Sequence, residues 1–274
     1  MIRRKLRKDE SVTLNITLGV IAQVCDISKR AGREIMEIYK TDFEVETKAD
    51  SSPVTQADRI AEALIIKAIK EEITATFPIV GEEAFAAGNA PDVAGKPFWL
   101  VDALDGTKQF VARRDEFTVN IALIENGRPV LGVVHIPAYE ATYWGSRYGA
   151  FAETDQAQPA PISCRRPPQD GLVALVSRSH RTPEVDDFLA PYTVKKEISA
   201  GSSLKFCYVA AGRADIYPRM GRTMEWDTAA GHGVLMAAGG CVRTLDDEEL
   251  RYGKDGFENP HFVAKSGHVK PPKP

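Results

Sequence analysis

Three short segments of the sequence combine carboxylates with apolar or glycine neighbours in a way that is typical of a cation site. They are Gly81-Glu82-Glu83, the run WLVDALDGT over 99–107 and the run EWDTAAG over 225–231. In each segment the carboxylates stand where a predicted strand ends or a predicted helix begins. An acidic pair beside a buried strand is costly unless its charge is compensated. Mg²⁺ is a natural compensator, because it takes oxygen ligands and keeps several waters for a phosphate substrate.

Asp102 and Asp105 form the centre of this prediction, because they follow the apolar run FWLV. Glu82 ends another predicted strand and could join them, and Asp227 could add a fourth carboxylate from the start of a helix. Gly106-Thr107 supplies backbone N–H groups where a helix or turn begins. Such groups beside Mg²⁺ form a seat for a phosphate. The residues therefore predict metal-assisted hydrolysis of a phosphate ester.

Each segment also fits a role without chemistry. The alternatives are a solvated strand end for Glu82 and Glu83, turn positions for Asp102 and Asp105, a helix N-cap for Asp227 and a capping-box position for Asp58. One segment alone would leave the choice open. Three acidic segments at the ends of elements favour the metal site.

The elements that must position these residues can be predicted from periodicity. Apolar residues at helical spacing predict an amphipathic helix over 14–38, and the run FEVETK predicts a short strand. A proline-bearing turn over 51–55 leads into a second helix, which carries the apolar face 60–68. Thr55 and Asp58 precede that face in a capping-box pattern.

Strands dominate the middle of the chain, and strands alternate with helices after it. Asn126-Gly127 predicts a type I′ hairpin between TVNIALIE and PVLGVVHI. Residues 155–170 are polar and proline-rich, so we expect a crossing between two halves there. The predicted halves are an α+β half over 1–155, with most metal ligands, and an α/β half over 156–274, with Asp227 and substrate-binding segments.

Composition limits the classes of function. The chain has 274 residues and a formal charge of −3, which is not the balance of a nucleic-acid binder. Four cysteines lie far apart, so we expect a reducing, cytoplasmic location without disulfides. No apolar run is long enough for a membrane span, and the basic start is not a secretory signal. That basic start could bind weakly to the inner face of an anionic membrane, although a solvated tail is the favoured interpretation. The assembly is expected to be a monomer or a homodimer.

The motifs IVGEE, WLVDALDGT and EWDTAAG, with SPVTQAD upstream, resemble the inositol monophosphatase superfamily. VSRSH and the stretch over 201–235 resemble its bacterial 3'(2'),5'-bisphosphate nucleotidase branch. The resemblance implies a layered αβαβα sandwich of the inositol monophosphatase and fructose-1,6-bisphosphatase type. It also places the active site between the two halves.

The same resemblance implies roles for individual residues. Two or three Mg²⁺ ions would be held by Glu82, Asp102, the Leu104 carbonyl, Asp105 and Asp227. The implied catalytic residues are Asp58, Glu82 and Thr107, of which Asp58 and Thr107 position the attacking water. Glu83 would contact these residues without binding the metal itself. The superfamily usually has proline where Ala103 stands. A lysine at Lys108 is more like the nucleotidase branch.

The second half offers groups for a substrate that bears two phosphates. Gly201-Ser202-Ser203-Leu204-Lys205 opens a predicted helix, and Ser202 and Lys205 could hold the second phosphate or the ribose. The alternative is an ordinary serine cap with a surface lysine. The predicted substrate contacts are Gly106, Thr107, Lys108, His180, Gly201, Ser202, Lys205, Arg219 and Asp227.

The resemblance implies removal of the 3'-phosphate of adenosine 3',5'-bisphosphate, giving AMP and phosphate, in sulfur assimilation or nucleotide salvage. Inositol-1-phosphate and fructose-1,6-bisphosphate are the alternative substrates within the family, because the pocket decides among them. A metal-dependent binding module is the non-enzymatic alternative. The spacing of Cys207 and Arg213 also matches the C-x5-R of cysteine phosphatases. However, Cys207 lies on an apolar helical face, so we interpret it as a core residue.

Overall fold

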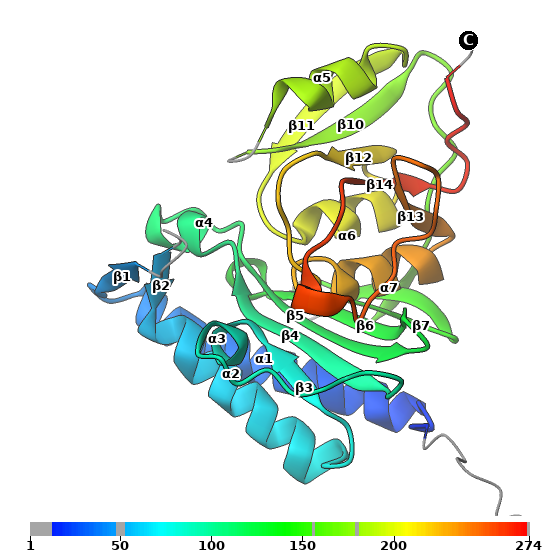
Figure 1. The fold of residues 1–274 in the computed structure, drawn as a ribbon. Coiled ribbons are helices and arrows are strands. Elements are labelled where there is room, and N and C mark those ends of the chain that lie inside the picture. Colours follow the sequence, from blue (N-terminus) through cyan, green and yellow to red (C-terminus); the bar gives the residue numbers. More distant parts are fainter. Residues whose placement is uncertain (1–12, 48–52, 155–156, 179–180, 273–274) are drawn as a thin grey trace, which may run out of the picture.

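The computed structural model describes residues 13–47, 53–154, 157–178 and 181–272. Its elements stack in five layers (Figure 1), with helices outside, between and beyond two sheets. The order of layers is helix, sheet, helix, sheet, helix. This order confirms the predicted αβαβα fold class.

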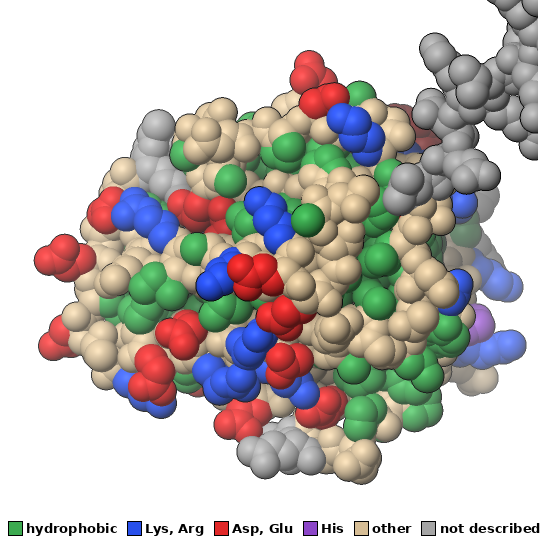
Figure 2. Space-filling model, turned by 90° about the horizontal axis from the view of Figure 1, so that it is seen from below, with side chains coloured by type: hydrophobic (Ala, Val, Ile, Leu, Met, Phe, Trp, Pro, Cys, Tyr) green, Lys and Arg blue, Asp and Glu red, His purple; other side chains and the backbone are tan. Residues whose placement is uncertain are grey.

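The first layer consists of α1 (Leu18–Tyr39) and α2 (Gln56–Ala68), which pack on one face of the larger sheet. Ile27, Ile35 and Ile65 are fully buried there, as an amphipathic helix pair requires. The outer face mixes acidic and basic side chains (Figure 2), among them the ion pairs of Arg30 with Asp26 and Glu72. A π-helical turn, Ile69–Ile73, continues α2.

The larger sheet has seven strands in the order of the chain. They are β3 (Ile79–Gly81), β4 (Phe98–Asp105), β5 (Thr118–Glu125), β6 (Arg128–Ile136), β7 (Ala141–Ser146), β8 (Gly149–Glu153) and β9 (Ala160–Ile162). β3 and β4 are parallel, and the other neighbours are antiparallel. Asn126 and Gly127 both have positive φ between β5 and β6, which fits the predicted type I′ turn.

Two helices fill the space between the sheets, and one helix covers the far side. The middle helices are α6 (Leu204–Ala210) and α7 (Ala229–Ala237), and the outer helix is α5 (Pro183–Leu189). The smaller sheet has the order β11-β10-β12-β14-β13. Its strands are β10 (Leu172–Ser177), β11 (Val194–Ala200), β12 (Ile216–Arg219), β13 (Gly240–Thr244) and β14 (Phe262–Ser266).

Some predicted elements differ in detail from the observed ones. The first helix begins at Leu18 rather than at Leu14, because Thr17 caps it by accepting a hydrogen bond from Val20 N at 3.2 Å. In the predicted proline turn, Pro53–Thr55 forms β2, which pairs with β1 (Val45–Thr47). The sequence did not reveal the short helices α3 (Glu82–Ala86) and α4 (Thr107–Val111), or the 3₁₀ turns Pro137–Tyr139 and Asp255–Phe257.

The region expected to join the two halves still contributes to the larger sheet, because β9 pairs with β8. The division at residue 155 stays a prediction. Among the residues that the structure describes, no helix is both long and apolar enough to cross a membrane. The basic start of the chain lies outside the described residues.

Candidate active site

A cleft of about 1060 Å³ opens where the predicted halves meet. All three acidic segments line it, through residues such as Glu82, Asp102, Asp105 and Asp227. Gly201, Ser202, Lys205 and Arg219 line it as well. The cleft therefore brings together the predicted metal ligands and most of the predicted substrate contacts.

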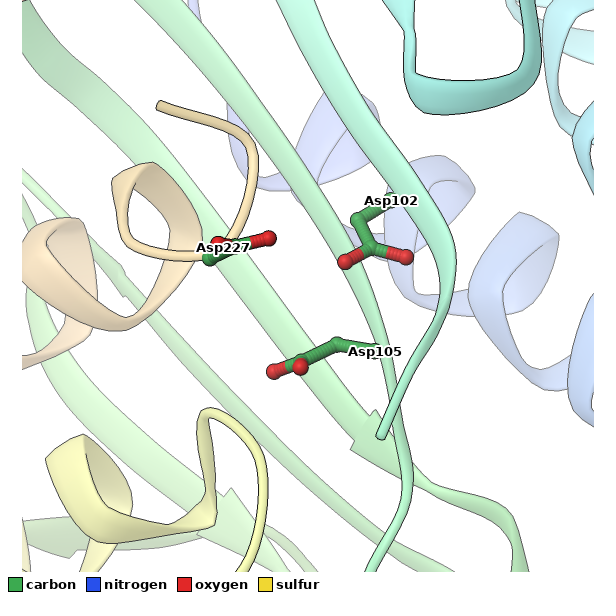
Figure 3. Close-up of side chains that lie close together, drawn as sticks. All are labelled: Asp102, Asp105 and Asp227. Atoms are coloured by element: carbon green, nitrogen blue, oxygen red, sulfur yellow. The ribbon is translucent and has the colours of Figure 1, made fainter. Parts of the chain in front are cut away.

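Three of the predicted metal ligands form a compact cluster (Figure 3). Asp102, Asp105 and Asp227 each offer a carboxylate oxygen within 4.8 Å of the others. Asp102 and Asp105 come from β4, whereas Asp227 comes from the turn before α7. Glu82 lines the same cleft from the start of α3, but it is not one of these three. The turn-residue alternative for Asp102 and Asp105 is wrong, because both lie in a strand.

An irregularity in β4 explains how Asp102 and Asp105 can act together. Residues three apart in a regular strand point to opposite faces of a sheet. Asp102 pairs with Asn120 and Asp105 pairs with Thr118, so three residues of β4 advance against two of β5. This bulge allows both carboxylates to face the cleft. Ala103, where the superfamily usually has proline, lies inside the bulge and is buried.

Ser203 connects the carboxylates that come from the two halves of the chain. Its backbone N donates to Asp105 Oδ2 at 2.6 Å, and its Oγ donates to the Asp227 carbonyl at 2.7 Å. Asn120 Nδ2 in turn donates to Ser203 Oγ at 3.0 Å. Neither Ser203 nor Asn120 was among the predicted site residues. Ser203 is 83 residues from Asn120 and 98 residues from Asp105 in the sequence. Spacing along the chain could therefore not reveal these contacts.

The pKa of Asp227 is strongly raised. Burial raises the pKa of its carboxyl to about 8, and repulsion from Asp105 and Glu82 adds to this rise. The N–H of Met224, which donates to Asp227 Oδ2 at 2.7 Å, acts in the opposite direction. Asp227 is not the N-cap of α7, since Thr228 holds that position. A cation would relieve the repulsion that the protein alone leaves.

The Glu82-Glu83 pair begins α3 instead of ending a strand in solvent. Buried Glu62 accepts hydrogen bonds from the N–H groups of Glu83 and Ala84, each at 2.8 Å. Glycine at position 81 leaves room for this carboxylate, because a Cβ would lie 2.5 Å from Glu62 Cδ. Glu62 thus orients the helix that carries Glu82. It was not among the predicted site residues, because it lies within an ordinary amphipathic helix pattern.

Asp58 closes the capping box and also contacts Thr107. Its Oδ2 accepts from Thr55 N at 2.8 Å, which closes the predicted capping box of α2. Its Oδ1 lies 3.0 Å from Thr107 Oγ1, and that hydroxyl is also 3.2 Å from the Leu104 carbonyl. Burial raises the pKa of the Asp58 carboxyl. Thr107 begins α4, after Gly106 in a left-handed conformation with φ of 95°.

Lys205 differs most from its predicted setting. It is a buried residue, and its Nζ donates to the Ser202 carbonyl at 2.6 Å and to the Ala200 carbonyl at 3.3 Å. The surface-lysine alternative is therefore wrong. Burial lowers its pKa to about 7, and Asp105 and Asp227 counteract this shift. Lys205 thus is a buried cation at the same cleft as the acidic cluster.

The remaining predicted substrate contacts have different settings. Arg219 is buried and donates to Ser177 Oγ and to the Arg222 carbonyl, each at 3.0 Å. Gly201 N donates to Glu116 Oε2 at 2.8 Å, and Lys108 is an exposed residue at the cleft. His180 lies outside the described residues.

Cys207 has no access to the cleft. Its side chain is fully buried in α6, and burial raises the pKa of its thiol far above the usual range. A nucleophilic cysteine needs the opposite shift. The alternative of a cysteine phosphatase is therefore wrong, and the core interpretation of Cys207 is confirmed. All four cysteines of the chain are free.

A family model described as "Inositol monophosphatase family" matches residues 19–270. The chain is 40% identical over 247 residues to the 3'(2'),5'-bisphosphate nucleotidase CysQ of Salmonella typhimurium, covering 89% of this chain and 98% of the relative. It is 34% identical over 260 residues to the protein of the same name from Haemophilus influenzae, covering 91% and 94%.

Solved structures show the same likeness. CysQ from Bacteroides thetaiotaomicron, titled a bacterial member of the inositol monophosphatase family, superposes with a TM-score of 0.76 at 35% identity and covers 92% of this chain and 98% of that chain. An IMPase from Thermotoga maritima has the same TM-score at 25% identity and covers 92% and 94%. The likeness extends over nearly the whole of each chain.

The raised pKa of Asp227 predicts a pH dependence of stability in the metal-free protein. Its pKa is about 8 in the folded state, whereas the usual value for an aspartate is 3.8. The folded state keeps a proton that the unfolded chain has released, so stability falls as the pH rises through this window and levels off above it. Asp227→Asn cannot release this proton, so it should not lose stability in this way. In EDTA, the melting temperature of the variant minus that of the wild type should therefore increase as the pH rises from about 5 to about 8. A difference that is constant with pH would contradict the assignment.

The setting of Cys207 predicts the behaviour of Cys207→Ser. The hydroxyl replaces a fully buried thiol, so the melting temperature should fall while phosphatase turnover stays nearly intact. Both quantities can be measured on one preparation. Loss of turnover at an unchanged melting temperature would restore the nucleophile hypothesis.

Proposed function

The chain belongs to the inositol monophosphatase family, and from this premise we propose that it is a metal-dependent 3'(2'),5'-bisphosphate nucleotidase. The reaction would release phosphate from adenosine 3',5'-bisphosphate and leave AMP. The observation that carries the proposal is the position of the Asp102, Asp105 and Asp227 cluster in one cleft with two buried cations, Lys205 and Arg219. The nucleotidase names of the relatives at 40% identity support the choice of substrate.

The donor set fits a hard divalent cation. Carboxylate oxygens and a backbone carbonyl are ligands that Mg²⁺ accepts. We propose that Asp102, Asp105 and Asp227 hold it together with Glu82 and the Leu104 carbonyl, in two or three sites. Bound Mg²⁺ would neutralise the phosphate and lower the pKa of a coordinated water.

Thr107 and Asp58 would orient the water that attacks phosphorus. The Thr107 hydroxyl donates a hydrogen bond to Asp58 Oδ1 at 3.0 Å, so its proton points toward that carboxylate. The oxygen of Thr107 is then free to accept a hydrogen bond from the water. Gly106 and Thr107 would also offer backbone N–H groups to the phosphate at the start of α4. The role of these residues is orientation and proton placement.

Lys205 and Arg219 would bind the second phosphate of the nucleotide. Both are buried at the cleft, where a charge-assisted hydrogen bond is strong. Burial lowers the pKa of Lys205 to about 7, and an incoming phosphate would stabilise its charged form. Ser202 and Gly201 stand beside Lys205, and Lys108 lies at the rim. His180 remains a proposed contact on the basis of its position in VSRSH.

The proposal includes a setting in the cell. We infer a cytoplasmic location, because all four cysteines are free. The relatives named 3'(2'),5'-bisphosphate nucleotidase support a place in nucleotide salvage or sulfur assimilation for this chain. The ligand would be a small nucleotide bisphosphate and not a nucleic acid. Monomer and homodimer stay open predictions.

A panel of substrates tests the function directly. We expect phosphate release from adenosine 3',5'-bisphosphate in Mg²⁺ to exceed release from inositol-1-phosphate and from fructose-1,6-bisphosphate, and EDTA should abolish all three. A higher kcat/KM on inositol-1-phosphate would instead establish the family alternative. Absence of turnover on all substrates would favour a metal-dependent binding module.

Replacing Lys205 by methionine tests the second phosphate site and avoids the cavity that alanine would leave. A hydrogen bond to a charged group is worth about 1.5–3 kcal/mol, so kcat/KM for adenosine 3',5'-bisphosphate should fall roughly ten- to a hundredfold, chiefly through KM. Activity on inositol-1-phosphate, which has one phosphate, serves as the internal control and should change little. An equal fall on both substrates would mean that Lys205 supports the acidic cluster instead.

A further inference from the structure

The turn that carries Asp227 is tied to a loop that follows it at a distance in the sequence. We name residues 251–259, between β13 and β14, the clamp loop. Asn259 Nδ2 donates to the Met224 carbonyl at 2.7 Å and to Thr228 Oγ1 at 3.0 Å. The backbone N of Asn259 donates to the Thr223 carbonyl at 2.9 Å. One residue of the clamp loop therefore holds both ends of the turn around Asp227.

A buried charge pair fastens the same turn from inside. The Glu225 carboxylate is fully buried and accepts from Gly253 N at 2.7 Å and from Lys254 N at 2.9 Å. Lys254 Nζ donates to Glu225 Oε1 at 2.6 Å and to Asn259 Oδ1 at 3.1 Å. One ammonium group thus compensates the buried carboxylate and orients the amide that grips the turn.

The clamp loop also contacts the helix that carries Glu82. The ring of Phe257 meets Phe85 of α3 edge-on, with centroids 5.8 Å apart. It lies 6.3 Å from the ring of Trp226, which is next to Asp227. The Phe257 carbonyl accepts from Glu225 N at 2.8 Å. The clamp loop therefore contacts both the helix that carries Glu82 and the turn that carries Asp227.

The loop has its own anchor on the larger sheet. Tyr252 N donates to the Gly127 carbonyl in the hairpin between β5 and β6, at 3.1 Å. Arg251 Nη1 lies 3.4 Å from the Asn126 carbonyl of the same hairpin. The clamp loop thus spans from the sheet that carries Asp102 and Asp105 to the turn that carries Asp227.

We propose that the clamp loop sets the spacing between Asp227 and the other carboxylates, with Lys254 and Asn259 as positioning residues for cation binding. Neither residue lines the cleft, so neither contacts substrate there. Removing the Lys254 ammonium takes away the charged partner of the buried Glu225 carboxylate and the donor to Asn259 Oδ1. The amide of Asn259 then lacks the contact that orients it toward the turn that carries Asp227. The inference rests on the proposed function, because it assumes a divalent cation at the cluster.

Lys254→Met tests the clamp, and Lys29→Met is its matched control. Lys29 forms an ion pair with Glu153 at 2.6 Å and is 30% exposed, as Lys254 is in its pair with Glu225, but Glu153 is 24% exposed whereas Glu225 is fully buried. Mg²⁺ binding to the metal-free full-length protein would be measured by titration calorimetry. Groups that orient metal ligands typically contribute 10–100-fold to affinity, so the dissociation constant should rise about tenfold in Lys254→Met. It should stay unchanged in Lys29→Met and recover largely in Lys254→Arg.

Turnover separates positioning from damage to the fold. At saturating Mg²⁺, kcat and the KM for nucleotide should stay within about twofold of the wild type, since the cation then restores the cluster. Where Lys254→Met does not fold, Asn259→Ser takes its place, because it removes the amide donors with a smaller change. A lower melting temperature with an unchanged Mg²⁺ dissociation constant would overturn the clamp alone. A wild-type protein that binds no Mg²⁺ would overturn the metal site and this inference together.

Discussion

Repulsion among the carboxylates of Asp102, Asp105 and Asp227 is the constraint that the rest of the structure has to offset. Their oxygens lie within 4.8 Å of one another at the cleft. Two unit charges at such a distance repel by about 3–4 kcal/mol at an effective dielectric constant of about 20. Backbone N–H groups of Ser203 and Met224 offset part of this cost, at 2.6 Å and 2.7 Å. The remaining imbalance appears in the raised pKa of Asp227, and a bound cation would relieve it.

The layered fold makes this approach of charges possible, because it brings α7 unusually close to the larger sheet. A Cβ on Gly132 of β6 would lie 2.2 Å from the Ala230 carbonyl, and a Cβ on Gly145 of β7 would lie 2.6 Å from the Gly233 carbonyl. Glycine at these two strand positions lets α7 pack directly against the backbone of the sheet. Asp227 lies just before this helix, so the distance between α7 and the sheet determines how near Asp227 comes to β4.

The parts of the site that could be predicted from the sequence are local. The capping box at Thr55 and Asp58 and the hairpin at Asn126 each depend on neighbouring residues, and the structure shows both. The strand expected to end before Asp102 continues to Asp105. Ser203, Glu62 and Asn259 act through contacts between elements far apart in the chain. Nothing in a single sequence marks them, because a serine, a glutamate or an asparagine there fits an ordinary surface equally well.

For Lys205, too, the sequence predicted the local setting but not the long-range one. Its position at a helix start predicted an anion contact, but periodicity could not show that its side chain is buried at the cleft that holds Asp105 and Asp227. Because cations of the protein and carboxylates share one cleft, binding of metal and substrate should depend on each other. The cluster alone would repel a phosphate, and a bound cation reverses the sign of the local field. A phosphate that reaches the cluster then adds ligands to the cation, so the two bind together more tightly than either alone.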